Sequence, residues 1–164
     1  MSHTTRVEPT RTAILLALGL MLLSAQIAPA AGVREIHPNL IGGEVLGRGF
    51  AVTANYERFL SNHFGLGAGF MMIGYSGGVV GVVPLYASYL SGNNHSLYLG
   101  AGACFVSEGG SVEDYEDTWV LQGSIGYHFQ SSSGFFVRPI FTLNQETGQG
   151  EFLIWPGVTI GGSF

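Results

Sequence analysis

The sequence predicts an all-β fold, an eight-stranded antiparallel up-and-down transmembrane β-barrel preceded by an N-terminal signal-peptide helix. The first observation is composition: 46% of the 164 residues are hydrophobic and only 10% are charged, whereas about a quarter of a soluble domain is charged. The second is that, beyond the N-terminal segment, apolar residues alternate with small or polar ones. A membrane barrel has this pattern because each strand turns one face to lipid. The third is the last segment, 151–164, which keeps the alternation and ends on Phe164.

Residues 1–30 have the organisation of an export signal. Two arginines precede an apolar run at 13–27. The run is shorter than the roughly 20 residues of a spanning helix, and it suits the apolar region of a signal peptide. Ala28-Pro29-Ala30 then matches an A-x-A cleavage site. We therefore expect cleavage near Ala30 and a mature barrel over 31–164, with an uncleaved anchor as the alternative.

Eight strand-like runs fill the mature chain after a short lead-in at 32–38. They lie at 39–46, 50–60, 64–74, 79–90, 96–106, 118–130, 135–145 and 151–164. Most have a length near the 9–11 residues with which a tilted strand crosses a bilayer. Eight is also the smallest strand number found in bacterial single-chain barrels.

The connections differ between the two ends of the predicted barrel. The turns at 61–63, 91–94 and 131–134 are tight and rich in turn residues. The connections of the other end are more varied, and they lie at 47–49, 75–78, 107–117 and 146–150. With the N-terminus in the periplasm, the tight turns face the periplasm and the varied loops face outside. This asymmetry is typical of outer-membrane barrels.

Three prolines lie inside predicted strands: Pro84, Pro139 and Pro156. Proline has no backbone N–H and is normally confined to edge strands or bulges. A closed barrel has no free edge, so we expect a bulge or a local separation of strands at each proline.

The alternation assigns a lipid face and a lumen face to each strand. In the third strand, Phe64, Leu66 and Phe70 alternate with glycines, and the fifth and sixth strands follow the same rule. The bulky apolar set must face lipid, and the small or polar set must fill the lumen. Aromatic residues also gather near the strand ends, as in the two girdles of a membrane barrel. The expected girdle residues are Phe64, Tyr89, Phe129, Phe135 and Phe164 at one rim and Phe50, Tyr75, Phe105, Trp119 and Phe152 at the other.

These features together resemble small outer-membrane β-barrel proteins of the OmpA-transmembrane-domain and OmpX type, and more loosely an uncharacterised outer-membrane β-barrel family. The residues that carry the resemblance are the signal peptide, the eight-run meander, Leu-Gly-Ala-Gly at 66–69 and 99–102, and the terminal aromatic. The resemblance implies that the barrel-assembly machinery reads the last strand through Phe164, Ile160 and Val158. Gly162 departs from that pattern, in which a larger apolar residue is usual. The resemblance also implies a monomer in the bacterial outer membrane, in contact with lipid and lipopolysaccharide.

Glu57 and Arg138 are the charged residues of the lumen-facing sets that lie at a similar depth, each about three residues from a periplasmic turn. Their strands are three apart once the barrel closes, so long side chains can meet across a narrow interior. We therefore predict an interior ion pair, with Asn55 and His128 nearby, because an unpaired internal charge is costly. A proton or ion relay is the alternative role for this network.

The predicted loop at 107–117 is acidic. Its carboxylates are Glu108, Glu113, Asp114, Glu116 and Asp117. Carboxylates bind Ca²⁺ or Mg²⁺, but the spacing does not match the D-x-D-x-D-G calcium loop. The sequence favours a solvated external loop, with metal or partner binding as the alternative.

We expect no enzymatic activity and no cofactor. His95-Ser96 is the only His–Ser neighbour pair after the signal segment, and it lies at a predicted periplasmic turn with no acid to orient the histidine. The formal net charge of −5 argues against nucleic-acid binding, which needs a basic face. Cys104 is the single cysteine and is expected to be a small buried residue.

The expected function is a structural or surface-interaction role in which the external loops are the recognition surface. The alternatives are a membrane-embedded lipid-modifying enzyme, of the lipid A deacylase or acyltransferase kind, and a soluble periplasmic barrel that binds an apolar ligand. Open diffusion is not expected, because eight strands leave an interior that side chains just fill.

Overall fold

A computed structural model of the chain describes residues 32–76, 78–109, 115–146 and 152–164. The predicted signal peptide and its cleavage site lie outside these ranges. The described helices are a single turn, α2 (Val33–Ile36), and a short 3₁₀ segment, η2 (Gly47–Gly49). Within the described ranges no helix has the length and apolar character needed to cross a membrane.

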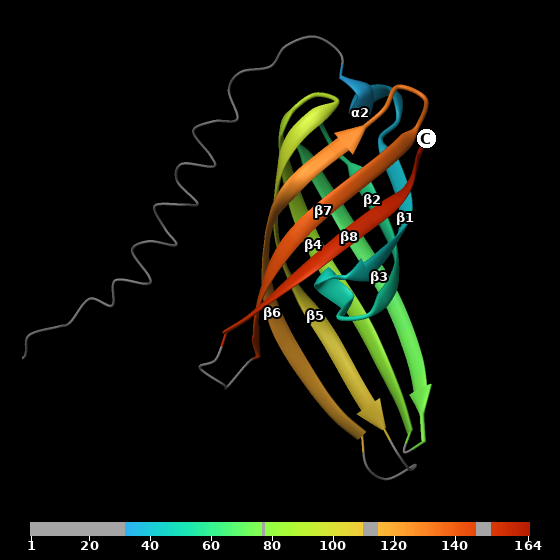
Figure 1. The fold of residues 1–164 in the computed structure, drawn as a ribbon, viewed down its shortest axis with the longest axis vertical. Helices are drawn as coiled ribbons and strands as arrows, with labels where there is room; N and C mark the ends of the chain where they lie inside the picture. Colours follow the sequence, from blue (N-terminus) through green and yellow to red (C-terminus); the bar gives the residue numbers. More distant parts are fainter. Residues whose placement is uncertain (1–31, 77, 110–114, 147–151) are drawn as a thin grey trace, which may run out of the picture. The chain divides into compact units, whose positions relative to one another are not determined.

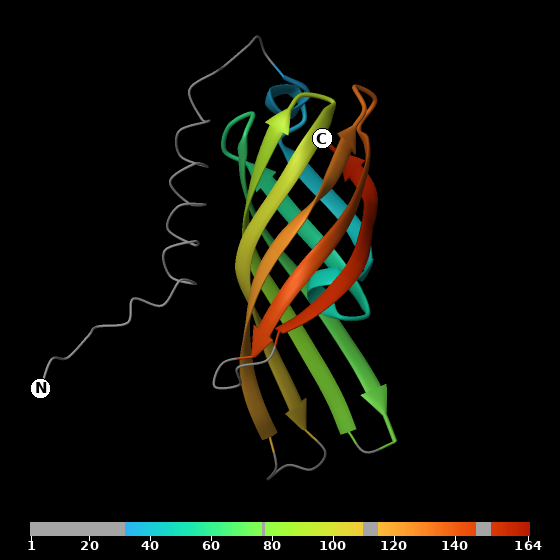
Figure 2. The ribbon, with the colours of Figure 1, turned by 60° about the vertical axis from the view of Figure 1, so that its left-hand side comes forward.

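Eight antiparallel strands form a closed barrel in which each strand pairs with its neighbours in the chain and β8 pairs with β1 (Figures 1 and 2). The strands are β1 (Asn39–Leu46), β2 (Val52–Phe59), β3 (Phe64–Tyr75), β4 (Gly78–Gly92), β5 (His95–Gly109), β6 (Tyr115–Gln130), β7 (Phe135–Glu146) and β8 (Phe152–Ser163). The predicted fold class and strand number are confirmed. Each predicted strand bound differs from the observed one by three residues or fewer.

The two ends of the barrel differ. Helix α2, the tight turns and the last residue, Phe164, share one end, which we call the terminal end and which is uppermost in Figure 1. Backbone hydrogen bonds of 2.9 Å in both directions between Asn39 and Phe164 tie the first strand to the end of the chain there. The opposite end, called the loop end, carries the connections β3–β4, β5–β6 and β7–β8.

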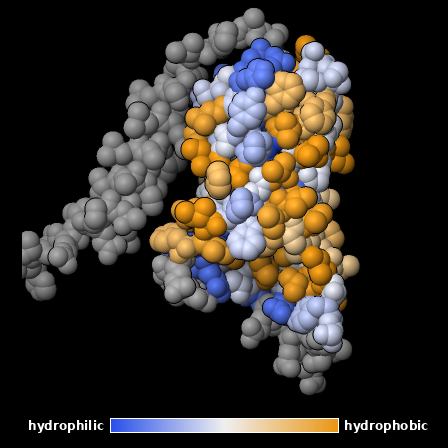
Figure 3. Space-filling model, in the orientation of Figure 1, coloured by the Kyte–Doolittle hydropathy of each residue, from blue (hydrophilic) through white to orange (hydrophobic). Residues whose placement is uncertain are grey.

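The outer surface of the barrel wall is apolar. Leu66, Leu121 and Ile160, all from the predicted lipid-facing sets, are 55%, 54% and 52% exposed. Residues of the opposite parity, such as Tyr98 and Thr159, are at most 1% exposed. Figure 3 shows apolar residues over the middle of the wall, with hydrophilic residues gathered toward the two ends. The residues predicted to face lipid therefore do form the outer surface of the barrel.

The height of the apolar wall can be worked out from β6. Ten residue steps separate Trp119 from Phe129, which corresponds to about 33 Å along a strand and about 25 Å along the barrel axis at a tilt of about 40°. At the loop-end rim, the Phe105 and Trp119 rings pack with centroids 5.2 Å apart. At the terminal rim, Phe64 and Tyr89 pack at 5.0 Å.

The wall is not equally high all round. Strands β1 and β2 have eight residues each, whereas β5 has 15 and β6 has 16. By the same arithmetic, β1 covers only about 18 Å of the axis. Figures 1 and 2 show β3 to β6 continuing well beyond η2, which lies partway along the barrel. On the side of β1 and β2, the wall therefore stops short of the loop-end rim.

Two predicted loops need correction. The segment 47–49 is not an external loop but the inward-turned η2, all of whose residues are buried. Because Leu46, Gly47 and Phe50 have positive φ angles of 60°, 70° and 65°, the chain reverses sharply enough to enter the lumen. Phe50 accordingly packs against an interior cluster and is not a girdle residue. The predicted loop at 107–117 is also shorter, because β5 and β6 pair as far as Gly109 and Tyr115.

The three prolines are accommodated without bulges. At Pro84 the β3–β4 ladder is interrupted between Ala68↔Leu85 and Met71↔Val82, and the register is the same on both sides. At Pro139 the β6–β7 ladder is interrupted in the same manner. Pro156 lies one residue beyond the last β1–β8 pair, Leu46↔Gly157. At Pro84 and Pro139 the missing N–H thus falls at a local separation of strands, which is one of the two expected solutions. At Pro156 it lies beyond the end of the neighbouring strand β1, which was not expected.

Candidate functional site in the barrel lumen

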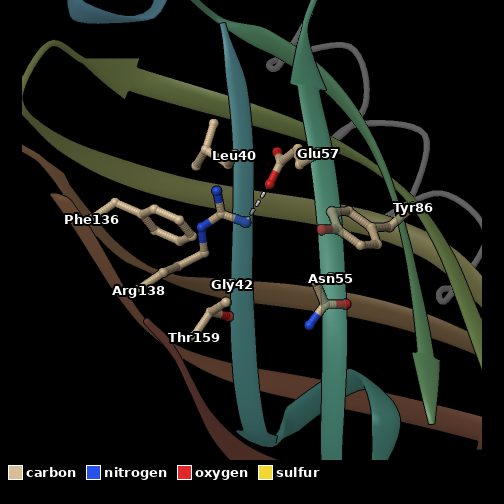
Figure 4. Close-up of a pocket in the computed structure, with 8 residues that line it drawn as sticks. All are labelled: Leu40, Gly42, Asn55, Glu57, Tyr86, Phe136, Arg138 and Thr159. Atoms are coloured by element: carbon tan, nitrogen blue, oxygen red, sulfur yellow. Dashed lines mark hydrogen bonds and ion pairs between the residues drawn. The ribbon is translucent and has the colours of Figure 1, made fainter. Parts of the chain in front are cut away.

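A buried ion pair crosses the lumen between β2 and β7. Glu57 and Arg138 are 2% and 1% exposed, and Arg138 Nη1 lies 2.6 Å from Glu57 Oε2. Figure 4 shows the two side chains pointing toward each other. Strands β1 and β8 separate their strands in the wall, so the contact depends on closure of the barrel. The structure thus brings together the two residues expected to pair.

Neighbouring side chains hydrogen-bond to both members of the pair, although Arg138 Nη2 has no hydrogen-bond partner among the described residues. Ser88 Oγ donates to Glu57, and Arg138 Nε donates to His128 Nδ1 at 3.1 Å. Because Nδ1 accepts, His128 is neutral with its proton on Nε2, which faces Gln130 Oε1 at 3.4 Å. The histidine therefore acts as an acceptor that helps to hold the guanidinium in place.

A small cavity adjoins the pair, and its lining residues are labelled in Figure 4. Its volume is about 10 Å³, which leaves room for roughly one water molecule. Asn55, which the sequence places near the ion pair, lines this cavity. Its amide Nδ2, however, donates to the backbone carbonyl of Thr53 at 3.4 Å and not to the pair.

A second buried ion pair lies closer to the loop end. Arg48, at the centre of η2, donates from Nε to Glu44 Oε2 at 3.0 Å, and its backbone N–H donates to Oε1 at 2.7 Å. Thr159 Oγ1 donates to the same carboxylate at 2.8 Å. The Arg48 guanidinium carbon lies 3.7 Å from the centre of the Tyr86 ring, and Nη1 donates to the Tyr98 hydroxyl at 3.2 Å. These contacts fix the inward-turned segment to β1, β4, β5 and β8.

A third buried arginine closes the terminal end. Arg34, on α2, is 2% exposed and donates to Ser96 Oγ at 2.7 Å. It also donates to the backbone carbonyls of Asn62, Gly92 and Asn93 at 2.8 to 3.0 Å. Burial, followed by repulsion from Arg138, lowers the pKa of Arg34 to about 10, so the side chain is charged at neutral pH. The guanidinium ties the lead-in segment to two turns of the terminal end.

The lumen is not filled only by small and polar residues, which corrects one expectation from the sequence. Toward the loop end, four buried residues form an apolar cluster: Met71, Val82, Cys104 and Val120. Toward the terminal end, a second apolar cluster contains Leu40, Phe59, Leu90, Tyr98, Phe136 and Ile140. The ion pairs lie among these bulky groups, because the interior of a narrow barrel must be packed as densely as any protein core.

The chemical consequence is a sealed interior. Charged, aromatic and aliphatic side chains succeed one another along the lumen from Arg34 to the apolar cluster at the loop end. The part of the chain that the structure describes contains no group of three or more His, Cys, Asp or Glu side chains able to hold a metal ion. The described part of the lumen is therefore closely packed with side chains.

The acidic residues of the loop end are only partly described. Glu108 is exposed and accepts a hydrogen bond from the Tyr75 hydroxyl at 2.7 Å, and Asp117 is exposed near the start of β6. Glu113, Asp114 and the Glu116 side chain lie outside the described residues. Metal or partner binding at this loop stays a prediction.

His95 and Ser96 point to opposite faces of β5. His95 is exposed, and its Nδ1 is hydrogen-bonded to the Tyr127 hydroxyl. Ser96 is 3% exposed and donates to the Asn93 carbonyl at 2.8 Å. Successive residues of a strand project to opposite sides, so this pair cannot act as nucleophile and base.

Of the residues expected to guide assembly, Val158 and Ile160 lie on the outer face of β8, and Phe164 directly follows that strand. Phe164, Ile160 and Val158 are 59%, 52% and 39% exposed. Their recognition by the assembly machinery stays a prediction. Cys104 is fully buried, with 0% exposure.

Arg34, Glu44 and Arg48 are lumen residues that were not predicted from the sequence. Glu44 has the parity of the lumen set in β1, and this signal could have identified it. Arg34 and Arg48 lie in segments taken for a lead-in and a loop, where no strand parity applies. Their burial depends on where the backbone turns, and the alternation of apolar and polar residues along the strands does not predict these turns.

Comparison with known proteins supports the fold. No protein-family model matches the chain, and no curated protein matches it in sequence. Among solved structures, the N-terminal β-barrel domain of Pseudomonas aeruginosa OprF superposes with a TM-score of 0.55 at 16% sequence identity, over 75% of this chain and 94% of that domain. Ail, the attachment invasion locus protein of Yersinia pestis, gives a TM-score of 0.43 at 14% identity, over 76% and 93% of the two chains. The similarity to the OprF domain concerns the fold: this chain is an eight-stranded barrel of that kind.

Proposed function

We propose that the chain is a sealed outer-membrane β-barrel with a structural or surface-interaction role, exposing its loop end at the cell surface. The observation that carries this proposal is the pairing of an apolar outer wall with a charged and filled lumen. A soluble barrel that holds an apolar ligand needs the reverse arrangement, with polar groups outside and apolar groups lining the interior.

The dimensions support a membrane environment. The aromatic rims of β6 bound an apolar wall about 25 Å high, which equals the apolar band of outer-membrane barrels. Closure of β1 on β8 leaves no free edge over most of that height, and only closed barrels satisfy their backbone hydrogen bonds in lipid when built from strands.

The filled lumen supports anchoring and surface presentation over transport. A cavity of about 10 Å³ is the void beside the central ion pair, far too small for a solute. The loop end carries the exposed Glu108 and Asp117, whereas three of the four arginines in the described chain, Arg34, Arg48 and Arg138, are buried. Because these arginines are buried, the exposed carboxylates of the loop end would repel lipopolysaccharide phosphates unless divalent cations bridge the two.

Cell fractionation combined with gel mobility tests the proposal. The full-length chain is expressed in a Gram-negative host, and the membranes are separated by density. We expect the protein in the outer-membrane fraction, with a mobility that changes on boiling, and no conductance in planar bilayers. Recovery in the soluble periplasmic fraction would exclude the membrane role, and stepwise ion conductance would exclude the sealed lumen.

The alternative of a lipid-modifying enzyme is tested by the same preparation. Reconstituted protein is incubated with lipid A in vesicles, and the products are analysed by mass spectrometry. Loss or gain of an acyl chain that depends on folded protein would favour the enzyme over the structural role.

A further inference from the structure

The outer wall carries an apolar groove of about 450 Å³ that crosses β6, β7, β8 and the end of β1. From this groove we infer a seat for one acyl chain of a membrane phospholipid, an inference that rests on the proposed membrane location. The face formed by β7 and β8 is the one toward the reader in Figures 1 and 3.

The strand registers define one wall of the groove. Tyr127 lies opposite the interrupted position of Pro139, Pro139 pairs with Val158, and Val158 pairs with Val45. These four side chains form a row across four strands, so the row is about 14 Å long at a strand spacing of about 4.8 Å. The row therefore extends far enough to accompany much of an acyl chain.

Phe141 and Pro156, which are paired with each other, form the second wall. On β7 and β8 the two rows are two residues apart, a separation of about 7 Å. Gly126 and Gly157 line the groove between the rows, and a Cβ on Gly157 would point inward onto Gly47, so no side chain rises from the floor. Two walls built partly from proline also lose little side-chain entropy when a chain lies between them.

The dimensions select a linear hydrocarbon chain over other occupants. An α-helix is about 10–12 Å wide with its side chains, which is wider than the separation of the walls. Addition of a strand needs a free sheet edge, but Val158 is paired on both sides, to β7 and to β1. The stretch of β8 without a β1 partner begins at Pro156, which has no N–H to offer.

The position of the groove indicates which leaflet supplies the lipid. Tyr127 lies three residues from the terminal end of β6, and its hydroxyl is hydrogen-bonded to the exposed His95 at the rim. From there the groove runs toward the loop end as far as Leu46, the last residue of the short strand β1. A phospholipid of the periplasmic leaflet can thus place its headgroup near His95 and Tyr127 while one chain follows the groove.

Native mass spectrometry of the folded barrel tests this inference. The protein is inserted into vesicles of phosphatidylethanolamine and phosphatidylglycerol, extracted in detergent and sprayed as the intact barrel. Pro156→Trp fills the groove, and Ile154→Trp is the matched control, because Ile154 is 65% exposed on the same face of β8 but lies outside the groove. We expect one retained phospholipid in the wild type and in Ile154→Trp, and at least a fivefold smaller lipid-bound fraction in Pro156→Trp.

Boiling-sensitive mobility is measured for every variant before extraction. If Pro156→Trp does not insert, Val45→Trp fills the groove from β1, and Val52→Trp serves as its control from the exposed position opposite. Equal lipid retention in the groove-filled variant and its control would overturn the inference, as would an inserted wild-type barrel that retains no lipid. A wild-type chain that fails to insert into vesicles would instead contradict the proposed membrane role.

Discussion

Replacing Arg138 with methionine removes the positive charge of the central ion pair and keeps most of the aliphatic volume. Glu57 would then retain the Ser88 hydroxyl but lose the Nη1 donor 2.6 Å away, and His128 would lose the donor to Nδ1. Breaking a buried pair by removing one partner typically costs about 3–5 kcal/mol. We expect Arg138→Met to lower the free energy of unfolding of the barrel by an amount in this range.

The double variant Glu57→Gln/Arg138→Met separates the loss of the pair from the loss of packing. With no carboxylate left to bury, much of the penalty should disappear, because replacing a whole buried pair can be close to neutral. A double-mutant cycle then reports a coupling free energy of more than about 1 kcal/mol, as is usual for contacting residues of one network.

Urea unfolding of the barrel in detergent micelles or vesicles, followed by tryptophan fluorescence, supplies the measurement. Arg58→Met is the matched control, because Arg58 is exposed and its guanidinium donates to Asn39 at 3.2 Å on the outer face. Its cost should stay below about 1 kcal/mol. If Arg138→Met and Arg58→Met unfold at the same urea concentration, the lumen pair does not stabilise the barrel and the reasoning fails.

Three further predictions concern the ends, the seam and the core. Arg34→Gln leaves the carbonyls of Asn62, Gly92 and Asn93 without their guanidinium donors, so unfolding in urea should be easier by about 1–3 kcal/mol; an unchanged urea midpoint would show that α2 does not tie the terminal end. A Cβ on Gly161 would lie 2.0 Å from the Ile41 carbonyl oxygen, whereas one on Gly43 would meet no atom within 4 Å. Gly161→Ala should therefore reduce the yield of the boiling-sensitive folded form on gels and Gly43→Ala should not, and equal yields would contradict the tight β1–β8 seam. Because Cys104 is fully buried, the folded barrel should react with maleimide at least tenfold more slowly than the urea-unfolded chain, and similar rates would mean that the loop-end cluster is open to solvent.

The Glu57–Arg138 pair of the lumen can be predicted from the alternation along the strands, whereas the burial of Arg48 cannot. Glu57 and Arg138 could be paired in advance because strand parity sends both inward and the distance to the nearest turn sets a similar depth. Arg48 could not, because residues 47–49 have the composition of an external turn. Only the positive φ angles at Leu46, Gly47 and Phe50 and the carboxylate of Glu44 explain why that turn enters the barrel.

The sequence by itself determined the number of strands, their approximate bounds and the apolar outer face. These properties depend on a two-residue period along one strand, and that period is visible in the chain without knowledge of any neighbour. The tertiary structure decided which side chains meet across the lumen, how the prolines fall beside gaps in the ladders, and how the groove beside Pro139 and Pro156 arises. These properties depend on the register between strands and on closure of β1 with β8, which relate residues more than a hundred positions apart, such as Glu44 and Thr159.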